Sequence, residues 1–188
     1  TGQIAGFFIA GRMGRTDPRV SMILGFVLIG MSGWALAFLD LNVSPQHIGW
    51  AVLLQGLGSG ILWVPITTAG FWSLPSRLLP EGSAFFHLLR NIGQSIYLAV
   101  SFLIIVRTSR INYADLSANI NPFNEILGYR WLIGAWRLDS VGGLEALNSE
   151  VSRQAQMISF NNAFVLYGAT CFCVIPIVFL WQRKGKSV

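Results

Sequence analysis

The sequence predicts an all-α membrane protein with four full membrane-spanning helices and a partial helix before them. Two observations lead to this fold class. Hydrophobic residues make up 53% of the chain and charged residues only 11%, whereas about 25% of the residues in a soluble domain are charged. The hydrophobic residues also gather in four runs that reach the ~20 residues a helix needs to cross a bilayer. The lipid bilayer is therefore the first partner that the sequence predicts.

The composition does not support other classes of protein. The net charge of +5 does not indicate nucleic-acid binding, because the basic residues lie at the ends of apolar runs and form no basic face. Cys171 and Cys173 lie inside an apolar run without metal-ligand spacing, and we expect them to be buried apolar thiols. The sequence contains no glycine-rich phosphate loop and no nucleophile beside a base, so it predicts no enzyme, no cofactor and no metal site.

The chain opens with an apolar run at residues 1–10, which is too short to span a bilayer. Because no initiator methionine precedes this run, we expect it to be the end of a helix that begins upstream, and the chain to be the C-terminal piece of a longer protein. A basic turn follows at residues 11–19. Its charged residues are Arg12, Arg15, Asp17 and Arg19.

Four full spans follow, and the basic residues beside them predict their orientation. The spans are residues 20–39, 48–72, 83–106 and 163–182. Lys and Arg concentrate on the cytoplasmic side of a membrane, so the turn 11–19 and the basic tail 183–188 are both expected in the cytoplasm. By alternation the long loop 107–162 faces the outside, and from Gly143 it forms a helical lead-in to the last span.

The first two spans contain small residues that predict close helix packing. In the first span these are Gly25, Gly30 and Gly33, and in the second they are Gly56 and Gly60. Pro65 is expected to kink the second span, because it removes one backbone hydrogen bond.

A row of larger side chains also runs along the second span. Gln55, Ser59, Trp63 and Thr67 recur at four-residue steps and therefore share one face of the helix. One interpretation is a cavity-lining helix that binds apolar or cationic molecules through the Trp63 ring. The alternative is a packing interface.

The third span carries Arg90, the one charged residue within the four spans. Such a charge costs roughly 2.5–3.5 kcal/mol at the centre of a membrane helix. The same face carries the polar residues His87, Asn91 and Gln94. We expect Arg90 to bond carbonyls or polar groups of adjacent helices near the cytoplasmic mouth, as part of a gate or a bundle support. The alternative is an arginine that reaches back to the headgroups. His87 is expected to be solvated or bonded to a neighbour, with a proton carrier as its alternative.

Several stretches resemble the EmrB/QacA-type drug:proton antiporters, the fourteen-helix branch of the major facilitator superfamily. The stretches are AGRMGRTDPR, GLGSGILWVPITTAGFWSLP, SAFFHLLRNIGQSI and QAQMISFNNAFVLYG. The resemblance implies that the partial helix and four spans correspond to helices ten to fourteen of that family. One departure occurs in the basic turn. Counting from Gly11, Arg15 stands where the superfamily pattern G-x-x-x-D-[RK] has its aspartate, and Asp17 lies two residues on.

The resemblance further implies a secondary transporter in the bacterial inner membrane that exports amphipathic or drug-like molecules by alternating access. None of the four spans contains Asp or Glu, so the carboxylate that carries the coupling proton is expected upstream of this chain. By the same resemblance, the outer loop is a candidate contact for a periplasmic adaptor. The alternative function is a non-transporting membrane scaffold or channel subunit.

Overall fold

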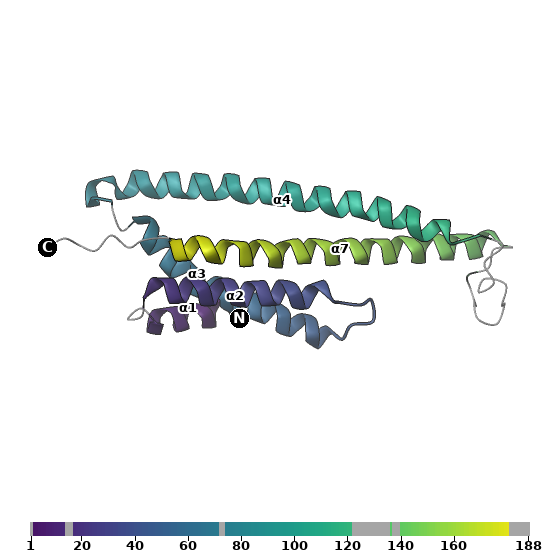
Figure 1. Ribbon diagram of the computed structural model, residues 1–188, viewed down its shortest axis with the longest axis horizontal. Coiled ribbons are helices and arrows are strands. Elements are labelled where there is room, and N and C mark those ends of the chain that lie inside the picture. The colour runs from purple at the N-terminus through teal and green to yellow at the C-terminus, as the bar shows by residue number, and fades with distance from the viewer. Residues whose placement is uncertain (1, 14–16, 72–73, 122–135, 137–139, 181–188) are drawn as a thin grey trace. The chain divides into compact units, whose positions relative to one another are not determined.

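The computed structural model describes residues 2–13, 17–71, 74–121, 136 and 140–180, and this part of the chain contains helices but no strand. The helices are α1 (Gly2–Arg12), α2 (Pro18–Ala37), α3 (Pro45–Phe71), the short 3-10 helix η2 (Ser76–Leu78), α4 (Leu79–Ala118) and α7 (Val141–Leu180) (Figure 1). Four segments are long and apolar enough to cross a membrane, namely α2, α3, η2 with α4, and α7. The fold class predicted from the sequence is thereby confirmed.

Local sequence signals account for where the helices begin. Pro18 and Pro45 are the first residues of α2 and α3, a position where the fixed φ of proline suits the helix and its missing N–H would have no partner. Ser140 precedes α7, and its Oγ accepts a hydrogen bond from the backbone N–H of Gly143 at 3.1 Å. A serine cap of this kind satisfies one of the donors left unpaired at a helix start.

Two helices continue well past the apolar runs that predict the spans. α4 continues beyond Val106 to Ala118, which adds about 18 Å at ~1.5 Å per residue. α7 begins at Val141, so it adds about 33 Å before Ala163. Hydropathy marks where the apolar side chains end, whereas the backbone hydrogen bonds of a helix can continue beyond that point.

The chain divides into two compact units. The bundle unit consists of residues 1–97 and 164–188, and the hairpin unit consists of residues 98–163. The bundle unit contains α1, α2, α3, the first half of α4 and the last part of α7. The hairpin unit contains the remainder of α4 and α7.

Within the bundle unit, α3 packs directly against the backbones of α1 and α2. A Cβ added to Gly60 would lie 2.9 Å from the Cα of Gly6 in α1, and one added to Gly58 would lie 2.8 Å from the carbonyl oxygen of Gly25 in α2. Gly56 makes a similar approach to α1, where an added Cβ would lie 2.9 Å from the backbone nitrogen of Gln3. Both neighbours of α3 therefore require glycine at the points of contact.

Glycines also bring α2 close to α7. A Cβ added to Gly30 would lie 2.9 Å from the ring of Phe172, and one added to Gly33 would lie 2.9 Å from the ring of Tyr167 and 3.0 Å from the backbone of Gly168. The prediction that Gly25, Gly30 and Gly33 admit neighbouring helices is confirmed, and the neighbours are α3 for the first and α7 for the other two.

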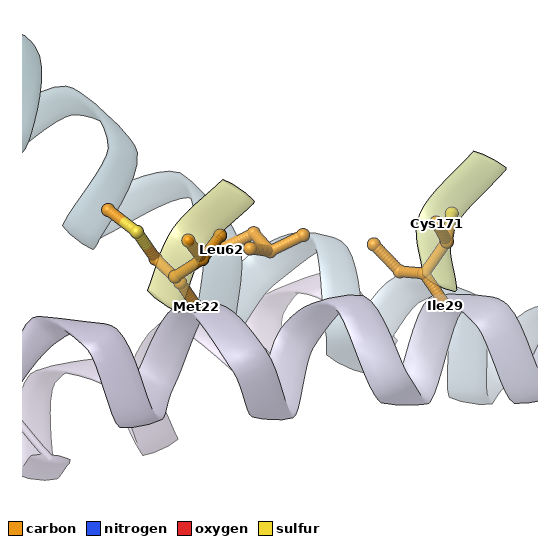
Figure 2. Packing of buried hydrophobic residues seen from close by; sticks show 5 residues of the cluster. Met22, Ile29, Leu62 and Cys171 are labelled. Carbon is orange, nitrogen blue, oxygen red and sulfur yellow. The ribbon is translucent and has the colours of Figure 1, made fainter. Parts of the chain in front are cut away.

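The apolar core of the bundle unit joins α2, α3 and α7. Its buried members are Met22, Ile29, Leu62, Cys171 and Val178. Figure 2 shows Met22 beside Leu62 and Ile29 beside Cys171. The expectation of buried thiols is therefore correct for Cys171 and wrong for Cys173, which is exposed. The two residues are separated by two positions, and a helix turns about 200° over that distance.

A buried hydrogen bond crosses the same core. Ser32 is fully buried, and its Oγ donates a hydrogen bond of 2.7 Å to the backbone carbonyl of Ala51. This contact ties α2 to the first half of α3.

In the hairpin unit, one face of α7 is buried at four-residue steps. The residues of this face are Gly143, Leu147, Val151, Ala155 and Ser159. Two hydrogen bonds join this part of α7 to α4: Asn112 Nδ2 donates to Ser159 Oγ at 3.4 Å, and the Tyr113 hydroxyl donates to Asn148.

The exposed side of the same helix segment carries an ion pair. Arg153 lies 2.8 Å from Glu150. Hydrogen bonds from Arg153 and Gln154 lower the pKa of the Glu150 carboxyl below its usual value.

The α1–α3 contact predicts a position-specific effect of adding one methyl group. We expect Gly60→Ala to lower the free energy of unfolding by about 1–3 kcal/mol, because the new Cβ meets the backbone of α1. Thermal unfolding of the purified protein in a nonionic detergent measures the change. Gly49→Ala on the same helix is the matched control, because an added Cβ there meets nothing within 4 Å. Equal melting temperatures for the two variants would contradict the packing described above.

Candidate functional site

The candidate site lies in the bundle unit, where the end of α3 meets the first half of α4. Two aromatic contacts hold this region together. The rings of Phe71 and Phe86 are tilted against each other with centroids 5.4 Å apart. One turn further along α4, the guanidinium carbon of Arg90 lies 4.4 Å from the centroid of the Trp63 ring. These contacts set the position of Arg90 relative to α3.

The contact between Arg90 and Trp63 is a cation–π interaction. Arg90 is exposed in the structure, and at exposed sites such contacts are favourable by about 0.5–1 kcal/mol. The ring therefore offsets only part of the ~2.5–3.5 kcal/mol that a charge costs inside a membrane helix. We expected carbonyls or polar groups as the partners of Arg90, whereas the structure provides an aromatic ring. The sequence offers Trp63 as a ligand-stacking residue, whereas in the structure the protein's own arginine lies over its ring.

The two residues also match in depth. Trp63 is eight residues before the end of α3, which corresponds to about 12 Å at ~1.5 Å per residue. Arg90 is seven residues after Ser83, the start of the apolar run, which corresponds to about 10 Å. The pair therefore lies inside the predicted spans, nearer the end that the arginine distribution assigns to the cytoplasm.

The other polar residues of the α4 face are exposed. His87, Asn91 and Gln94 belong to this group. His87 contacts the ring of Phe86 edge-on, with centroids 5.7 Å apart, and the backbone carbonyl of Asn91 accepts a hydrogen bond from Ser95. Among the described residues, none forms a hydrogen bond with the side chain of Arg90, Asn91 or Gln94. Within the part of the chain that the structure describes, the polar face of α4 is therefore exposed.

Two members of the row on α3, Gln55 and Trp63, contact two different helices. Near one end, Gln55 Nε2 donates a hydrogen bond of 3.0 Å to the hydroxyl of Tyr167 in α7. Near the other end, Trp63 meets Arg90 in α4. Since eight residues separate Gln55 from Trp63, the two contacts are about 12 Å apart along α3.

The hydroxyl groups of the row bond to the backbone of α3 itself. Ser59 Oγ donates to the carbonyl of Gly56, and Thr67 Oγ1 donates to the carbonyl of Trp63, each at 2.9 Å. Pro65, which cannot donate a backbone hydrogen bond, is buried, and α3 continues through it without interruption. Gly56 and Gly60 contact α1, so they lie beside the row and not on it.

Tyr167 is the residue of this region that sequence reasoning missed. It lies in a span that shows no polar stripe, and it both packs on Gly33 and accepts the hydrogen bond from Gln55. A single phenol inside an apolar run was the available signal, because a buried tyrosine hydroxyl normally finds a partner.

The charged residues of the basic turn lie around the junction of α1 and α2. Arg12 is the last residue of α1, Asp17 directly precedes α2, and Arg19 lies in its first turn. Arg15 lies outside the described residues. Over the described ranges, no cluster of three His, Cys, Asp or Glu residues is placed to hold a metal ion.

Comparison with known proteins identifies bacterial relatives. The chain is 23% identical over 179 residues to the multidrug export protein EmrB of Haemophilus influenzae, a match that covers 94% of the chain and 35% of the relative. It is 23% identical over 186 residues to the colistin resistance protein EmrB of Acinetobacter baumannii, covering 96% of the chain and 36% of the relative. It is also 31% identical over 114 residues to YcnB, an uncharacterized MFS-type transporter of Bacillus subtilis, covering 57% and 23% respectively.

The two EmrB matches extend over nearly the whole chain, but the chain spans only about a third of the length of those two proteins. No family model matches the chain, and no solved structure matches it.

The hydrogen bond between Gln55 and Tyr167 predicts a measurable coupling between these two positions. In a double-mutant cycle of Gln55→Leu and Tyr167→Phe, the stability losses should be non-additive by about 0.6–1.7 kcal/mol, the range found for hydrogen bonds between membrane helices. Thermal unfolding of the four variants gives this coupling. Gln55→Leu combined with Tyr113→Phe, which alters the hairpin unit instead, should be additive. An additive result for the first pair would contradict the hydrogen bond.

The cation–π contact predicts a second coupling. A cycle of Arg90→Met and Trp63→Leu should show a coupling of about 0.5–1 kcal/mol in unfolding free energy, because either change alone removes the interaction. Trp50 offers the matched control on the same helix, since it is 68% exposed, and Trp50→Leu should be additive with Arg90→Met. A coupling at Trp50 as large as at Trp63 would show that the contact is not specific.

Proposed function

Since this chain belongs to the EmrB-type family of the major facilitator superfamily, we propose that it is the C-terminal part of a proton-coupled transporter that exports amphipathic, drug-like molecules. The names of the relatives support this proposal, because they include a multidrug export protein and a probable multidrug resistance protein. The four membrane-length helices support it, because the chain is built as a multi-pass membrane protein.

The observation that favours transport over a scaffold is the polar face of α4. Ionisable and polar side chains are expensive inside a membrane and usually mark a pathway for a substrate or an ion. Arg90, Asn91 and Gln94 lie within a predicted span and have no hydrogen-bond partner among the described residues. A scaffold helix that faces only lipid and packed neighbours gains nothing from this arrangement, whereas a helix beside an aqueous substrate path does.

Proton coupling requires a group that binds and releases a proton at membrane depth. None of the four spans contains a carboxylate, so the proposed coupling residue lies in the part of the transporter outside this chain. In this proposal the partial helix and the four spans are helices ten to fourteen of a fourteen-helix transporter in the bacterial inner membrane, with the C-terminus in the cytoplasm. Alternating access arises when this bundle rocks against its N-terminal counterpart. The outer loop, residues 107–162, is the proposed contact for a periplasmic adaptor.

Substrate-driven proton release in everted membrane vesicles tests this function. Vesicles containing the full-length transporter are energised until they are acidic inside, which quenches a pH-sensitive acridine dye. Addition of an exported compound should restore the fluorescence, because each substrate molecule enters the vesicle in exchange for protons. A channel subunit would instead dissipate the gradient before any substrate is added, and a scaffold would give no response; either result would reject the proposal.

In the same assay, Arg90→Ala should reduce the substrate-dependent signal by about tenfold or more, equivalent to at least ~1.4 kcal/mol. Immunoblots should show little change in the amount of protein in the membrane. Arg107→Ala is the matched control, because Arg107 lies on the same helix beyond the predicted span. Normal export by the Arg90→Ala variant would remove this residue from the transport mechanism.

A further inference from the structure

Arg90 carries a charge without a counter-ion in the described part of the chain. The predicted spans contain no Asp or Glu, and the contact made by Arg90 is with the neutral Trp63 ring. A buried or membrane-embedded charge is normally paired with an opposite charge. The group that the Arg90 guanidinium lacks, among the described residues, is therefore an anion.

The cation–π contact leaves the hydrogen-bonding capacity of Arg90 unused. The guanidinium group has five N–H donors arranged as a planar fork, and the attraction to a ring face arises from its positive charge, not from those donors. No described residue accepts a hydrogen bond from them. The fork matches the two oxygens of a carboxylate or the oxygens of a sulfonate in bidentate geometry. Trp63 thus holds the guanidinium in place while its donors remain available.

The surroundings add apolar surface to this anion-binding group. The Trp63 ring is only half-buried, and Leu89 is 54% exposed next to Arg90 on α4. The exposed amides of Asn91 and Gln94 provide further donors within one turn. Sites for small molecules combine apolar surface with a few placed polar groups, and here the exposed polar groups beside Trp63 favour an anion.

We propose that Arg90 and Trp63 form a binding site for an amphipathic anion, with a carboxylate or sulfonate head on an apolar or aromatic body. The head binds the guanidinium and the body lies against Trp63 and the neighbouring apolar side chains. This assignment rests on the proposed function and narrows its substrate class. It opposes the cation-binding interpretation of Trp63, because the ring face is occupied by a group of the same charge as a cationic ligand.

A binding experiment with two matched probes separates the charge requirement from apolar partitioning. The full-length protein is reconstituted into phosphatidylcholine nanodiscs, which have no net charge. The probes are the fluorescent anion 11-(dansylamino)undecanoate and its neutral methyl ester, and binding is followed by energy transfer from tryptophan to the dansyl group. Arg90→Gln should weaken binding of the carboxylate by about tenfold or more and binding of the ester by less than about twofold.

Three further variants make the result specific. Arg90→Lys keeps the charge without the planar fork and should retain part of the affinity. Trp63→Leu should weaken binding of both probes, since it removes apolar surface beside Arg90 and the contact that positions the guanidinium. Arg107→Gln removes an equal charge from the same helix away from Trp63 and should leave both affinities unchanged. Size-exclusion chromatography confirms that each variant is folded before it is compared.

Three outcomes overturn the assignment: unchanged carboxylate affinity in Arg90→Gln, equal losses for acid and ester, or an equal effect of Arg107→Gln. Because the measurement requires no transport, its failure is distinguishable from failure of the proposed function. Proton exchange driven by other compounds alongside Arg90-independent binding would leave the exporter intact and remove the anion site. Arg90-dependent binding without any proton exchange would keep the anion site and reject the exporter.

Discussion

The direct contact between helix backbones around α3 is the constraint on which the bundle unit depends. In a membrane, helices do not associate to escape water, because lipid is as apolar as their side chains, so close packing must supply the attraction. Gly58 and Gly60 allow α2 and α1 to approach the backbone of α3 from two directions. Any larger side chain at these points would separate the helices and weaken every contact that lies along them.

This packing fixes the rotation of α3 about its axis, and the rotation in turn places the polar row. Because the glycines of α3 contact α1 and α2, Gln55 faces α7 and Trp63 faces α4. The two polar contacts therefore follow from where the small residues are. Gly30 and Gly33 perform the same role for α7, because they bring Tyr167 within reach of Gln55.

The polar groups of the bundle are satisfied in two different ways. Ser32, Ser59 and Thr67 donate to backbone carbonyls, which removes the cost of an unpaired hydroxyl in an apolar region. Arg90 is treated differently, since the ring of Trp63 stabilises its charge while its donors find no acceptor among the described residues. The three hydroxyl groups therefore stabilise the packed helices, whereas the Arg90 donors are available for a ligand. The proposed transport function depends on that distinction.

The sequence by itself determined the fold class, the approximate spans and the polar composition of the third span. It could do so because a bilayer imposes a minimum apolar length and penalises each charge, and both effects can be read from the order of residues. The close approach at Gly25, Gly30 and Gly33 was predictable for the same reason, since small residues in an apolar run have few other uses. The extension of α4 to Ala118 was less visible, because hydropathy does not record where backbone hydrogen bonding stops.

Only the tertiary structure decided which side chains meet. The partner of Arg90 is an aromatic ring twenty-seven positions earlier in the chain, and the partner of Gln55 is a tyrosine 112 positions later. Cys171 is buried while Cys173 is exposed, although both lie in one apolar run. Such outcomes depend on how each helix is rotated against its neighbours, and that rotation is set by contacts between residues far apart in sequence.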